Sequence, residues 1–332
     1  MEWEFGFLFF SEFGQRFMGK RLVLALGGNA LGNTPEEQLK LVETTASAIV
    51  DLEEDGYDVV VGHGNGPQVG MVNLALEYSA THGGKTPLMP FPECGAMTQG
   101  YIGYHLQQAI QREHGRRHMP RPCAAVLTQV VVDENDPAFQ NPTKPIGSFY
   151  GKNEAEAIAR KTGYTFVEDA GRGWRRVVPS PKPVKIVELP VVRRLIEAHT
   201  TVITVGGGGI PVVQKGWDDF RGVAAVIDKD RACAKLAIDL KADMLVILTA
   251  VEKVSINFNQ PNQYDLDSMS VEEARQFMAE GQFAPGSMLP KVESCVNFLE
   301  KRPSGMALIT SLEKAREALW GKTGTIIVSK KR

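Results

Sequence analysis

Paired cysteines and long apolar runs are both missing from the sequence. The cysteines lie far apart, and none belongs to a C-x-x-C pair. They are Cys94, Cys123, Cys233 and Cys295. This spacing indicates neither a zinc site nor a disulfide framework, so reduced thiols are expected. No segment approaches the roughly 18 apolar residues that cross a bilayer. We therefore predict a cytoplasmic protein with no membrane partner.

The sequence also lacks an excess of charge of either sign. Its 37 lysines and arginines nearly balance 39 aspartates and glutamates, which leaves a formal net charge of -2. Domains that bind nucleic acid usually carry a basic excess, so nucleic acid is not expected as a partner. With 332 residues, 43% of them hydrophobic, the chain is long enough for one large α/β domain or two smaller ones.

Two common nucleotide-binding motifs are absent. Gly321-Lys322-Thr323 lacks the upstream glycine of a P-loop, and Gly62-His63-Gly64 is followed by Asn65-Gly66-Pro67 instead of the rest of G-x-G-x-x-G. These patterns disfavour a P-loop enzyme and a dinucleotide-dependent dehydrogenase.

The first 17 residues differ from the rest of the chain. They contain an apolar cluster, but Glu2 and Glu4 stand where a signal peptide carries positive charge. Met18 lies just before the first convincing strand. We interpret residues 1–17 as an upstream extension, disordered or artefactual, with a membrane-touching tail as the alternative. Residues 18–330 are then expected to form a single domain.

Strands and helices alternate along the chain in a pattern typical of a parallel sheet. Residues 21–26 form an apolar run that ends at two glycines, and residues 57–61 form another that ends at Gly62. Between them, Thr34-Pro35-Glu36-Glu37 has the features of a helix start, and apolar residues recur at helical spacing as far as Gly56. This is the βαβ pattern. Further strands are predicted at 201–205, 244–248, 306–310 and 325–328, and helices at 270–280 and 288–301.

Residues from about 133 to 185 interrupt this pattern. The segment is rich in proline, has a basic stretch from Arg172 to Lys185, and contains a helix expected at about 153–161. Long irregular segments in compact domains are usually functional or disordered. We interpret this one as a small subdomain that protrudes from the sheet.

Three glycine turns follow predicted strands: Gly27-Gly28-Asn29, Gly64-Asn65-Gly66 and Gly206–Gly209. Turns at the carboxyl ends of parallel strands are where α/β proteins bind ligands, and their free N–H groups suit an anion. For any one of them, a tight turn that needs positive φ is the simpler explanation. The three together are able to surround one polyphosphate.

Phosphoryl transfer needs positive charge around the moving group. Lys229 lies where an apolar strand, ending at Val226-Ile227, is expected to meet a new helix, and Asp230 beside it can fix its ammonium group. A lysine at a helix N-terminus opposes the helix dipole, and such conflicts concentrate at functional sites. Lys291 follows a proline and glycine turn, where a catalytic lysine and an ordinary first-turn charge are equally plausible. Taken locally, Lys144 resembles a surface lysine.

Several long motifs together resemble the amino acid kinase superfamily and, within it, the carbamate kinase branch. The matching segments are Ala25–Ala30 (ALGGNA), His63–Gly70 (HGNGPQVG), Ala96–Gly103 (AMTQGYIG), Leu127–Asp133 (LTQVVVD), Asn141–Gly147 (NPTKPIG), Glu168–Pro183 (EDAGRGWRRVVPSPKP), Gly206–Val213 (GGGGIPVV), Ala225–Asp230 (AVIDKD) and Phe283–Lys291 (FAPGSMLPK). The similarity extends from about residue 20 to residue 328.

One position separates the branches. Other members resemble one another in a lysine two residues before the first Gly-Gly, where this chain has Ala25. Carbamate kinases lack that lysine and have one in the N-P-T-K-P-I-G loop, which corresponds to Lys144. The resemblance therefore makes Lys144 a candidate active-site cation.

The resemblance also implies the fold and the roles of the candidate residues. The fold would be a three-layer αβα sandwich around a mainly parallel, about eight-stranded open sheet, with the protruding subdomain, in a homodimer. Lys144, Lys229, Asp230 and Lys291 would be catalytic. Residues expected to bind the substrate and its phosphate are Gly27, Gly28, Asn29, Gly64, Asn65, Gly66, Gly207 and Gly208. Residues expected to bind ATP or ADP are Lys229, Thr249, Met288 and Lys291.

The implied reaction is reversible phosphoryl transfer in which ADP and carbamoyl phosphate give ATP and carbamate. Mg²⁺ would be carried by the nucleotide and not by a metal site of the protein. A kinase for another small acid, or a catalytically silent nucleotide-binding member of the same fold, remains an alternative.

Overall fold

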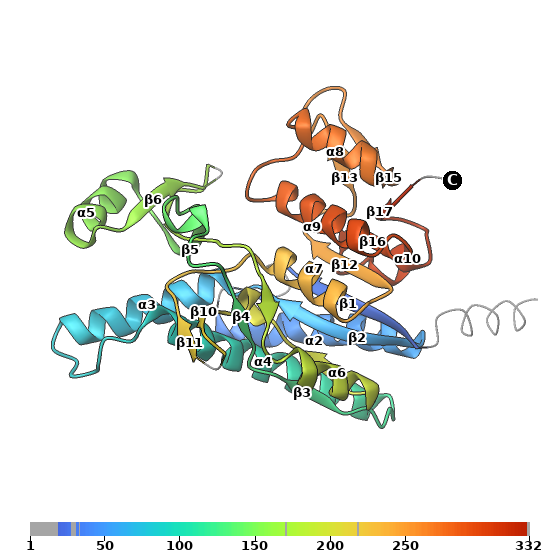
Figure 1. Cartoon of the computed structure of the whole chain (residues 1–332), viewed down its shortest axis with the longest axis horizontal. Helices are drawn as coiled ribbons and strands as arrows, with labels where there is room; N and C mark the ends of the chain where they lie inside the picture. Colours follow the sequence, from blue (N-terminus) through green and yellow to red (C-terminus); the bar gives the residue numbers. More distant parts are fainter. Residues whose placement is uncertain (1–18, 28–30, 33, 170, 218, 331–332) are drawn as a thin grey trace, which may run out of the picture.

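The computed structural model describes residues 19–27, 31–32, 34–169, 171–217 and 219–330. An eight-stranded sheet forms its centre, and adjacent strands run parallel except β16 and β17 (Figure 1). In spatial order the strands are β15 (Ser268–Ser270), β17 (Thr325–Val328), β16 (Met306–Ser311), β12 (Met244–Thr249), β1 (Lys20–Leu26), β2 (Tyr57–His63), β9 (Thr201–Ile203) and β3 (Cys123–Ala125). The predicted mainly parallel sheet is confirmed.

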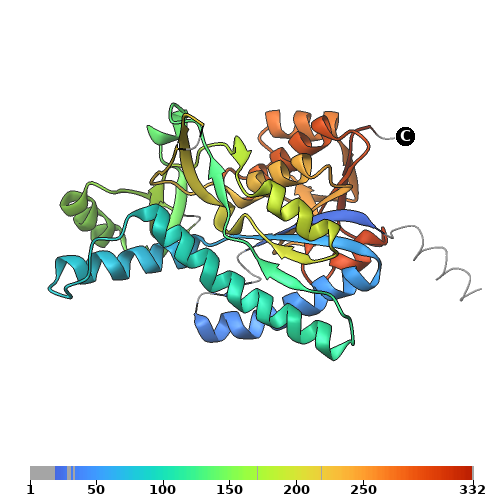
Figure 2. The same ribbon diagram turned by 60° about the horizontal axis from the view of Figure 1, so that its bottom comes forward.

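Helices cover both faces of this sheet (Figures 1 and 2). On one face lie α2 (Pro35–Glu54), α4 (Phe91–Arg116) and α10 (Ala315–Leu319). On the other face lie α6 (Leu189–Glu197), α7 (Lys229–Asp239), α8 (Val271–Ala279) and α9 (Met288–Lys301). The predicted three-layer αβα sandwich is therefore confirmed.

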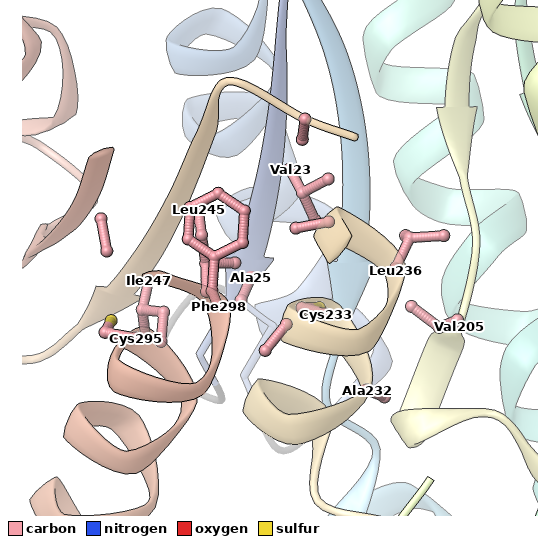
Figure 3. Close-up of a cluster of buried hydrophobic side chains, with 14 of the residues drawn as sticks. Val23, Ala25, Val205, Ala232, Cys233, Leu236, Leu245, Ile247, Cys295 and Phe298 are labelled. Atoms are coloured by element: carbon pink, nitrogen blue, oxygen red, sulfur yellow. The ribbon is translucent and has the colours of Figure 1, made fainter. Parts of the chain in front are cut away.

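Successive side chains of β1 point to opposite faces of the sheet, so this strand contributes to both apolar cores. Leu22, Leu24 and Leu26 face the core under α2 and α4, whereas Val23 and Ala25 face the core under α7 and α9. Figure 3 shows the second core, in which Val23 and Ala25 pack near Cys233, Cys295 and other buried side chains. A central parallel strand that is buried on both faces requires such a continuous apolar run. Burial of this kind fixes where β1 ends, and with it the position of the following turn.

Local signals explain the helix starts that the sequence predicts. The Thr34 hydroxyl accepts from the N–H of Glu37, and Pro35 opens α2. Ser270 and Glu273 form a reciprocal capping box at the start of α8. Both helices therefore begin where a side chain satisfies amide groups that the helix leaves unpaired.

Smaller sheets lie at the sides of the main one. One has the order β11 (Asp219–Gly222), β10 (Ile210–Lys215), β4 (Gln129–Val131) and β8 (Lys185–Ile186), and a two-stranded sheet pairs β13 (Val254–Ile256) with β14 (Tyr264–Leu266). The third, named the small sheet, has the order β5 (Lys144–Tyr150), β7 (Trp174–Val178) and β6 (Thr165–Glu168). It carries α5 (Lys152–Thr162), and the short helical turns η2 (Pro137–Phe139) and η3 (Gly206–Gly208) lie elsewhere.

The small sheet extends away from the main sheet beside α3 (Gly66–Thr81) (Figure 1). Two glycines allow this approach: a Cβ built on Gly70 of α3 would lie only 2.2 Å from the backbone of Gly147 in β5. Ile146 and Val178 of the small sheet join one buried apolar cluster with Val69 and Val226. The base of the small sheet is thus packed against α3 and against the segment that precedes α7.

Two details differ from the sequence prediction. The prediction of a strand that ends at Val226-Ile227 is wrong, because these buried residues belong to no strand. Val226 instead donates its N–H to the carbonyl of Pro179 at 2.9 Å. The strand predicted at 201–205 ends two residues early, because Val205 adopts a left-handed conformation with φ of 45° that starts the glycine turn.

The extension at residues 1–17 lies outside the described residues. Among the helices that the structure describes, none has both the length and the apolar character needed to cross a membrane.

Candidate active site

An aspartate shared by two lysines forms the centre of the candidate site. Lys229 and Asp230 open α7, and Lys291 lies in the first turn of α9. The Nζ of Lys229 donates to one carboxylate oxygen of Asp230, and the Nζ of Lys291 donates to the other at 2.9 Å. The Asp230 side chain is 3% exposed, and the two lysine side chains are 12% and 14% exposed. The structure thus brings Lys229, Asp230 and Lys291 together, as expected from the sequence.

Burial and charge act against each other in this cluster. Burial alone would raise the pKa of Asp230, but the positive charges of Lys229 and Lys291 hold that pKa below its usual range. Burial and the nearby charge of Lys229 together lower the pKa of Lys291. For Lys229, the attraction of Asp230 outweighs burial, so its pKa is raised. One carboxylate thus holds two ammonium groups, which leaves positive charge for an anion.

A second ion pair brings in the predicted loop lysine. Lys144, the first residue of β5, places its Nζ 2.5 Å from Oδ2 of Asp228. The other oxygen of Asp228 caps α7 by accepting from the N–H groups of Asp230 at 2.9 Å and Arg231 at 3.3 Å. Although burial acts in the opposite direction, the charges of Lys144, Lys229 and Lys291 lower the pKa of Asp228. Lys144 is therefore not a free surface lysine.

The turn between β2 and α3 lies against the side chain of Lys229 and against the strand that carries Lys144. A Cβ built on Gly64 would be 3.5 Å from Cδ of Lys229, and one built on Gly66 would be 3.6 Å from the carbonyl oxygen of Pro145, next to Lys144. On the other side, a Cβ on Gly27 would be 2.8 Å from the carbonyl oxygen of Leu248, which precedes Thr249. Small residues here leave room between the strands' carboxyl ends and the lysines.

The turn at Gly206–Gly209 packs against the Gly64–Gly66 turn and against the residues that precede α7. Gly208 has φ of 90°, and a Cβ there would meet the carbonyl oxygen of Ile227 at 2.0 Å, so only glycine fits. A Cβ on Gly207 would overlap the side chain of Asn65. This turn therefore packs directly against the Gly64–Gly66 turn and against the residue that precedes Asp228.

Sequence reasoning missed three supporting polar residues. Asp228 was not predicted, although a short acidic residue directly before a helix is a helix-cap signal. Thr98 accepts from the Asn65 side-chain amide at 2.9 Å. Gln99 donates to the carbonyls of Gly206 at 2.8 Å and Thr128 at 3.1 Å. Both lie on α4 within the Ala96–Gly103 motif, but neither side chain is charged, and charge is the signal that marks a phosphate site in a sequence.

His63 has a structural place behind the first of these turns. Its Nδ1 donates to the carbonyl of Gly64 at 2.9 Å. Burial lowers the pKa of His63 to about 4, so the ring is neutral near pH 7. A neutral ring that is bonded to the backbone fits a role in holding the turn.

The predicted nucleotide-binding residues lie on the carboxyl-terminal half of the sheet. Thr249 is the last residue of β12, and Met288 is the first residue of α9, one turn before Lys291. Gly28 and Asn29, predicted to bind substrate, lie outside the described residues. Gly27 lies next to Thr249, with a Cβ built on it 3.8 Å from Cα of Thr249, whereas Gly64 is the candidate glycine that lies against Lys229.

Such an arrangement can hold and stabilise a multiply charged anion. It offers three ammonium groups, of Lys144, Lys229 and Lys291, against the two carboxylates of Asp228 and Asp230. Preorganised positive charge in a partly desolvated position is the main requirement of phosphoryl transfer, which asks little other chemistry of the protein.

Known proteins are similar in sequence to nearly the whole chain. The model of the amino acid kinase family matches residues 20–307. The carbamate kinase-like protein YqeA of Escherichia coli K12 is 56% identical over 310 residues, which cover 93% of this chain and 99% of that protein. The carbamate kinase of Staphylococcus haemolyticus is 55% identical and covers 92% and 99%.

Solved structures of carbamate kinases are also similar to this chain in their fold. The carbamate kinase of Giardia lamblia bound to AMP-PNP is 43% identical and superposes with a TM-score of 0.84, covering 93% of this chain and 98% of that one. The same enzyme bound to citric acid gives a TM-score of 0.87 over the same shares of the two chains. Sequence motifs, sheet order and these likenesses agree with one another, and the chain belongs to the amino acid kinase family.

Proposed function

We propose that the chain catalyses reversible phosphoryl transfer between carbamoyl phosphate and ADP, giving carbamate and ATP. The observation that carries this proposal is the pairing of Lys144 with Asp228 beside the cluster of Lys229, Asp230 and Lys291. It puts a cation from the N-P-T-K-P-I-G loop next to the two lysines of the main sheet's helices. Ala25 in β1, fully buried, stands where other branches have their lysine.

In the forward step, an oxygen of the ADP β-phosphate forms a bond to the phosphorus of carbamoyl phosphate. The bond from that phosphorus to the carbamate oxygen breaks, and carbamate leaves as an anion. No general base is needed because neither the attacking phosphate nor the leaving carbamate must lose a proton. Carbamate is a poor nucleophile and its acyl phosphate a good donor, so ATP formation is the favoured direction.

The lysines then divide the charge between two substrates. Lys144 would face the carbamoyl phosphate side, and Lys229 and Lys291 would face the transferring group and the nucleotide phosphates, with Asp230 orienting both ammonium groups. N–H groups of Asn65 and Gly66 would donate to phosphate oxygens, and Gly207 and Gly208 would face the reacting phosphates, with the N–H of Gly208 donating to the carbonyl of Val205. The rate would come from positioning and from stabilisation of charge.

The nucleotide is expected to bring Mg²⁺, which neutralises charge between the phosphates when bound. Asp228 and Asp230 already accept hydrogen bonds from lysines. The phosphate oxygens and water, and not these carboxylates, are therefore the fitting ligands for the ion.

The proposal includes a homodimer, for which one face offers support. β3 is the last strand of the main sheet, and large apolar side chains are exposed around it. They are Met97 at 43%, Tyr104 at 59% and Leu127 at 57% exposure. Exposed apolar groups of this kind mark interaction surfaces. Light scattering after gel filtration tests this, and a Leu127→Asp variant is expected to shift the mass toward that of one chain.

Coupled ATP formation from ADP, Mg²⁺ and carbamoyl phosphate tests the reaction. Lys229→Ala is expected to lower kcat by roughly 10²–10³, the cost of removing one electrostatic contact to a transition state. Lys144→Ala is expected to lose turnover as well, whereas Lys152→Ala, an exposed lysine on α5 beside the same small sheet, serves as the control. A Lys229→Ala enzyme within threefold of the parent would contradict the assignment. A parent that binds nucleotide without turnover would point to another small acid or to a nucleotide sensor.

A further inference from the structure

The three lysines of the site differ in the elements that carry them. Lys229 and Lys291 lie on α7 and α9, which pack on the main sheet. Lys144 belongs to β5 of the small sheet, and its side chain is 28% exposed. The position of this ammonium group therefore depends on whatever contact fixes it to the main body of the protein.

Apolar packing already fixes the backbone at the base of the small sheet. Ile146, Val178 and Val226 lie in one buried cluster, and the N–H of Val226 bonds to Pro179, directly after β7. These contacts bring β5 next to the segment that leads into α7. They do not determine where the long Lys144 side chain points.

Asp228 supplies the contact that determines where the Lys144 side chain points. Its two carboxylate oxygens have separate partners: Oδ1 accepts from the first amides of α7, and Oδ2 accepts from Lys144 at 2.5 Å. The residue is 7% exposed, so its charge is only partly screened by water. One side chain thus caps the helix that carries Lys229 and Asp230 and also holds the third lysine.

We propose that Asp228 is a positioning residue that holds the Lys144 ammonium group at the site before substrate binds. The inference rests on the proposed function of Lys144. An arriving phosphate then meets a cation that Asp228 already holds next to the start of α7 and does not have to recruit a mobile lysine. Holding charge in place in advance lowers the barrier to reaction, and its loss appears in kcat.

The helix cap and the lysine contact can be separated by mutation. Asp228→Asn keeps an oxygen that caps α7, since asparagine is as good a cap as aspartate, but removes the negative charge that Lys144 contacts. Asp228→Ser is a second variant with a capping oxygen and no charge. Asp136→Asn is the matched control, because Asp136 also caps a helical turn with one oxygen, at 2.9 Å from the N–H of Ala138, and uses the other on the N–H of Lys182.

The first measurement is ATP formation by the full-length parent, Asp228→Asn, Lys144→Ala and the double variant. Asp228→Asn is expected to lower kcat on the order of 10- to 100-fold, the usual result of a displaced catalytic group. The double variant is expected to be no slower than Lys144→Ala, because Asp228 acts through Lys144. An Asp228→Asn enzyme as fast as Asp136→Asn, or single losses that multiply in the double variant, would overturn the proposal.

The second measurement does not need turnover. Acetylation of Lys144 by an activated ester is followed by mass spectrometry, with the exposed Lys152 of the same molecule as internal reference. Removing the carboxylate that holds the ammonium group at 2.5 Å is expected to free the side chain and to make labelling of Lys144 faster in Asp228→Asn than in the parent. Unchanged labelling would overturn the positioning role, whereas a parent without turnover would overturn the proposed reaction alone.

Discussion

Two aspartates separated by one residue organise the site in different ways. Asp230 is shared by Lys229 and Lys291, both from helices that pack on the main sheet, and those side chains are 12% and 14% exposed. Asp228 holds Lys144, which comes from the small sheet and is 28% exposed. The first group is part of the folded core, whereas the second joins two parts of the molecule. Both aspartates hold lysines in place, but Asp230 does so within the core, whereas Asp228 does so between the main body and the small sheet.

The two aspartates are expected to differ most in how much their replacement lowers the free energy of unfolding, and Asp230→Asn is expected to lower it more. It would leave two largely buried ammonium groups without their carboxylate, and such a loss costs about 3–5 kcal/mol. Asp228→Asn keeps the oxygen that caps α7 and leaves a lysine that water can reach, so its cost is expected to be smaller, about 1–2 kcal/mol. Urea unfolding of both variants measures the difference. Equal losses would show that the two aspartates are equally part of the core.

Local sequence signals predicted several helices, for physical reasons. The cap at Thr34 and the apolar spacing as far as Gly56 act between near neighbours in the chain, so α2 could be predicted directly. The helices predicted at 270–280 and 288–301 correspond to α8 and α9. Lys229 was predicted to lie at a helix start, and it is the first residue of α7. Each of these features depends only on neighbours in the chain.

Long-range contacts could not be predicted in that way. Asp228 and Lys144 are 84 residues apart, and nothing near either residue indicates the other. Considered locally, Lys144 resembled a surface charge, and only the resemblance to a known family placed it in the site. Val226-Ile227 was expected to end a strand because both residues are apolar, but the N–H of Val226 bonds to Pro179 and not to a neighbouring strand. The roles of the individual site residues and the division into residues 1–17 and 18–330 stay predictions.

The contact between α3 and β5 offers a way to move Lys144 without moving the Asp230 group. Gly70→Ala would place a methyl group 2.2 Å from the backbone of Gly147, so β5 and its Lys144 must shift. Asp230 and its lysines lie on other elements and should not move. We expect kcat for ATP formation to fall about tenfold, with ADP affinity by calorimetry changed less than about threefold.

Gly115→Ala is the control for that variant. Gly115 also lies within a helix, α4, and a Cβ there meets nothing within 4 Å. Its activity is expected to match the parent, and its stability to rise slightly, because alanine favours a helix over glycine. A Gly70→Ala enzyme that behaves like Gly115→Ala would show that β5 does not rest on this contact.

The smallest expected effect concerns His63, which bonds to the carbonyl of Gly64 in the turn that lies against Lys229. Burial lowers its pKa from 6.5 to about 4, so the unfolded chain binds a proton in this window while the folded protein does not. The free energy of unfolding must therefore decrease as the pH falls from about 6.5 toward 4. For this one group the loss between about pH 7.5 and pH 5 is about 2 kcal/mol. His63→Gln removes the titrating ring, so urea unfolding at the two pH values should show a smaller decrease than in the parent. An equal decrease in both proteins would place the acid sensitivity in other groups and leave His63 as a neutral support of the turn.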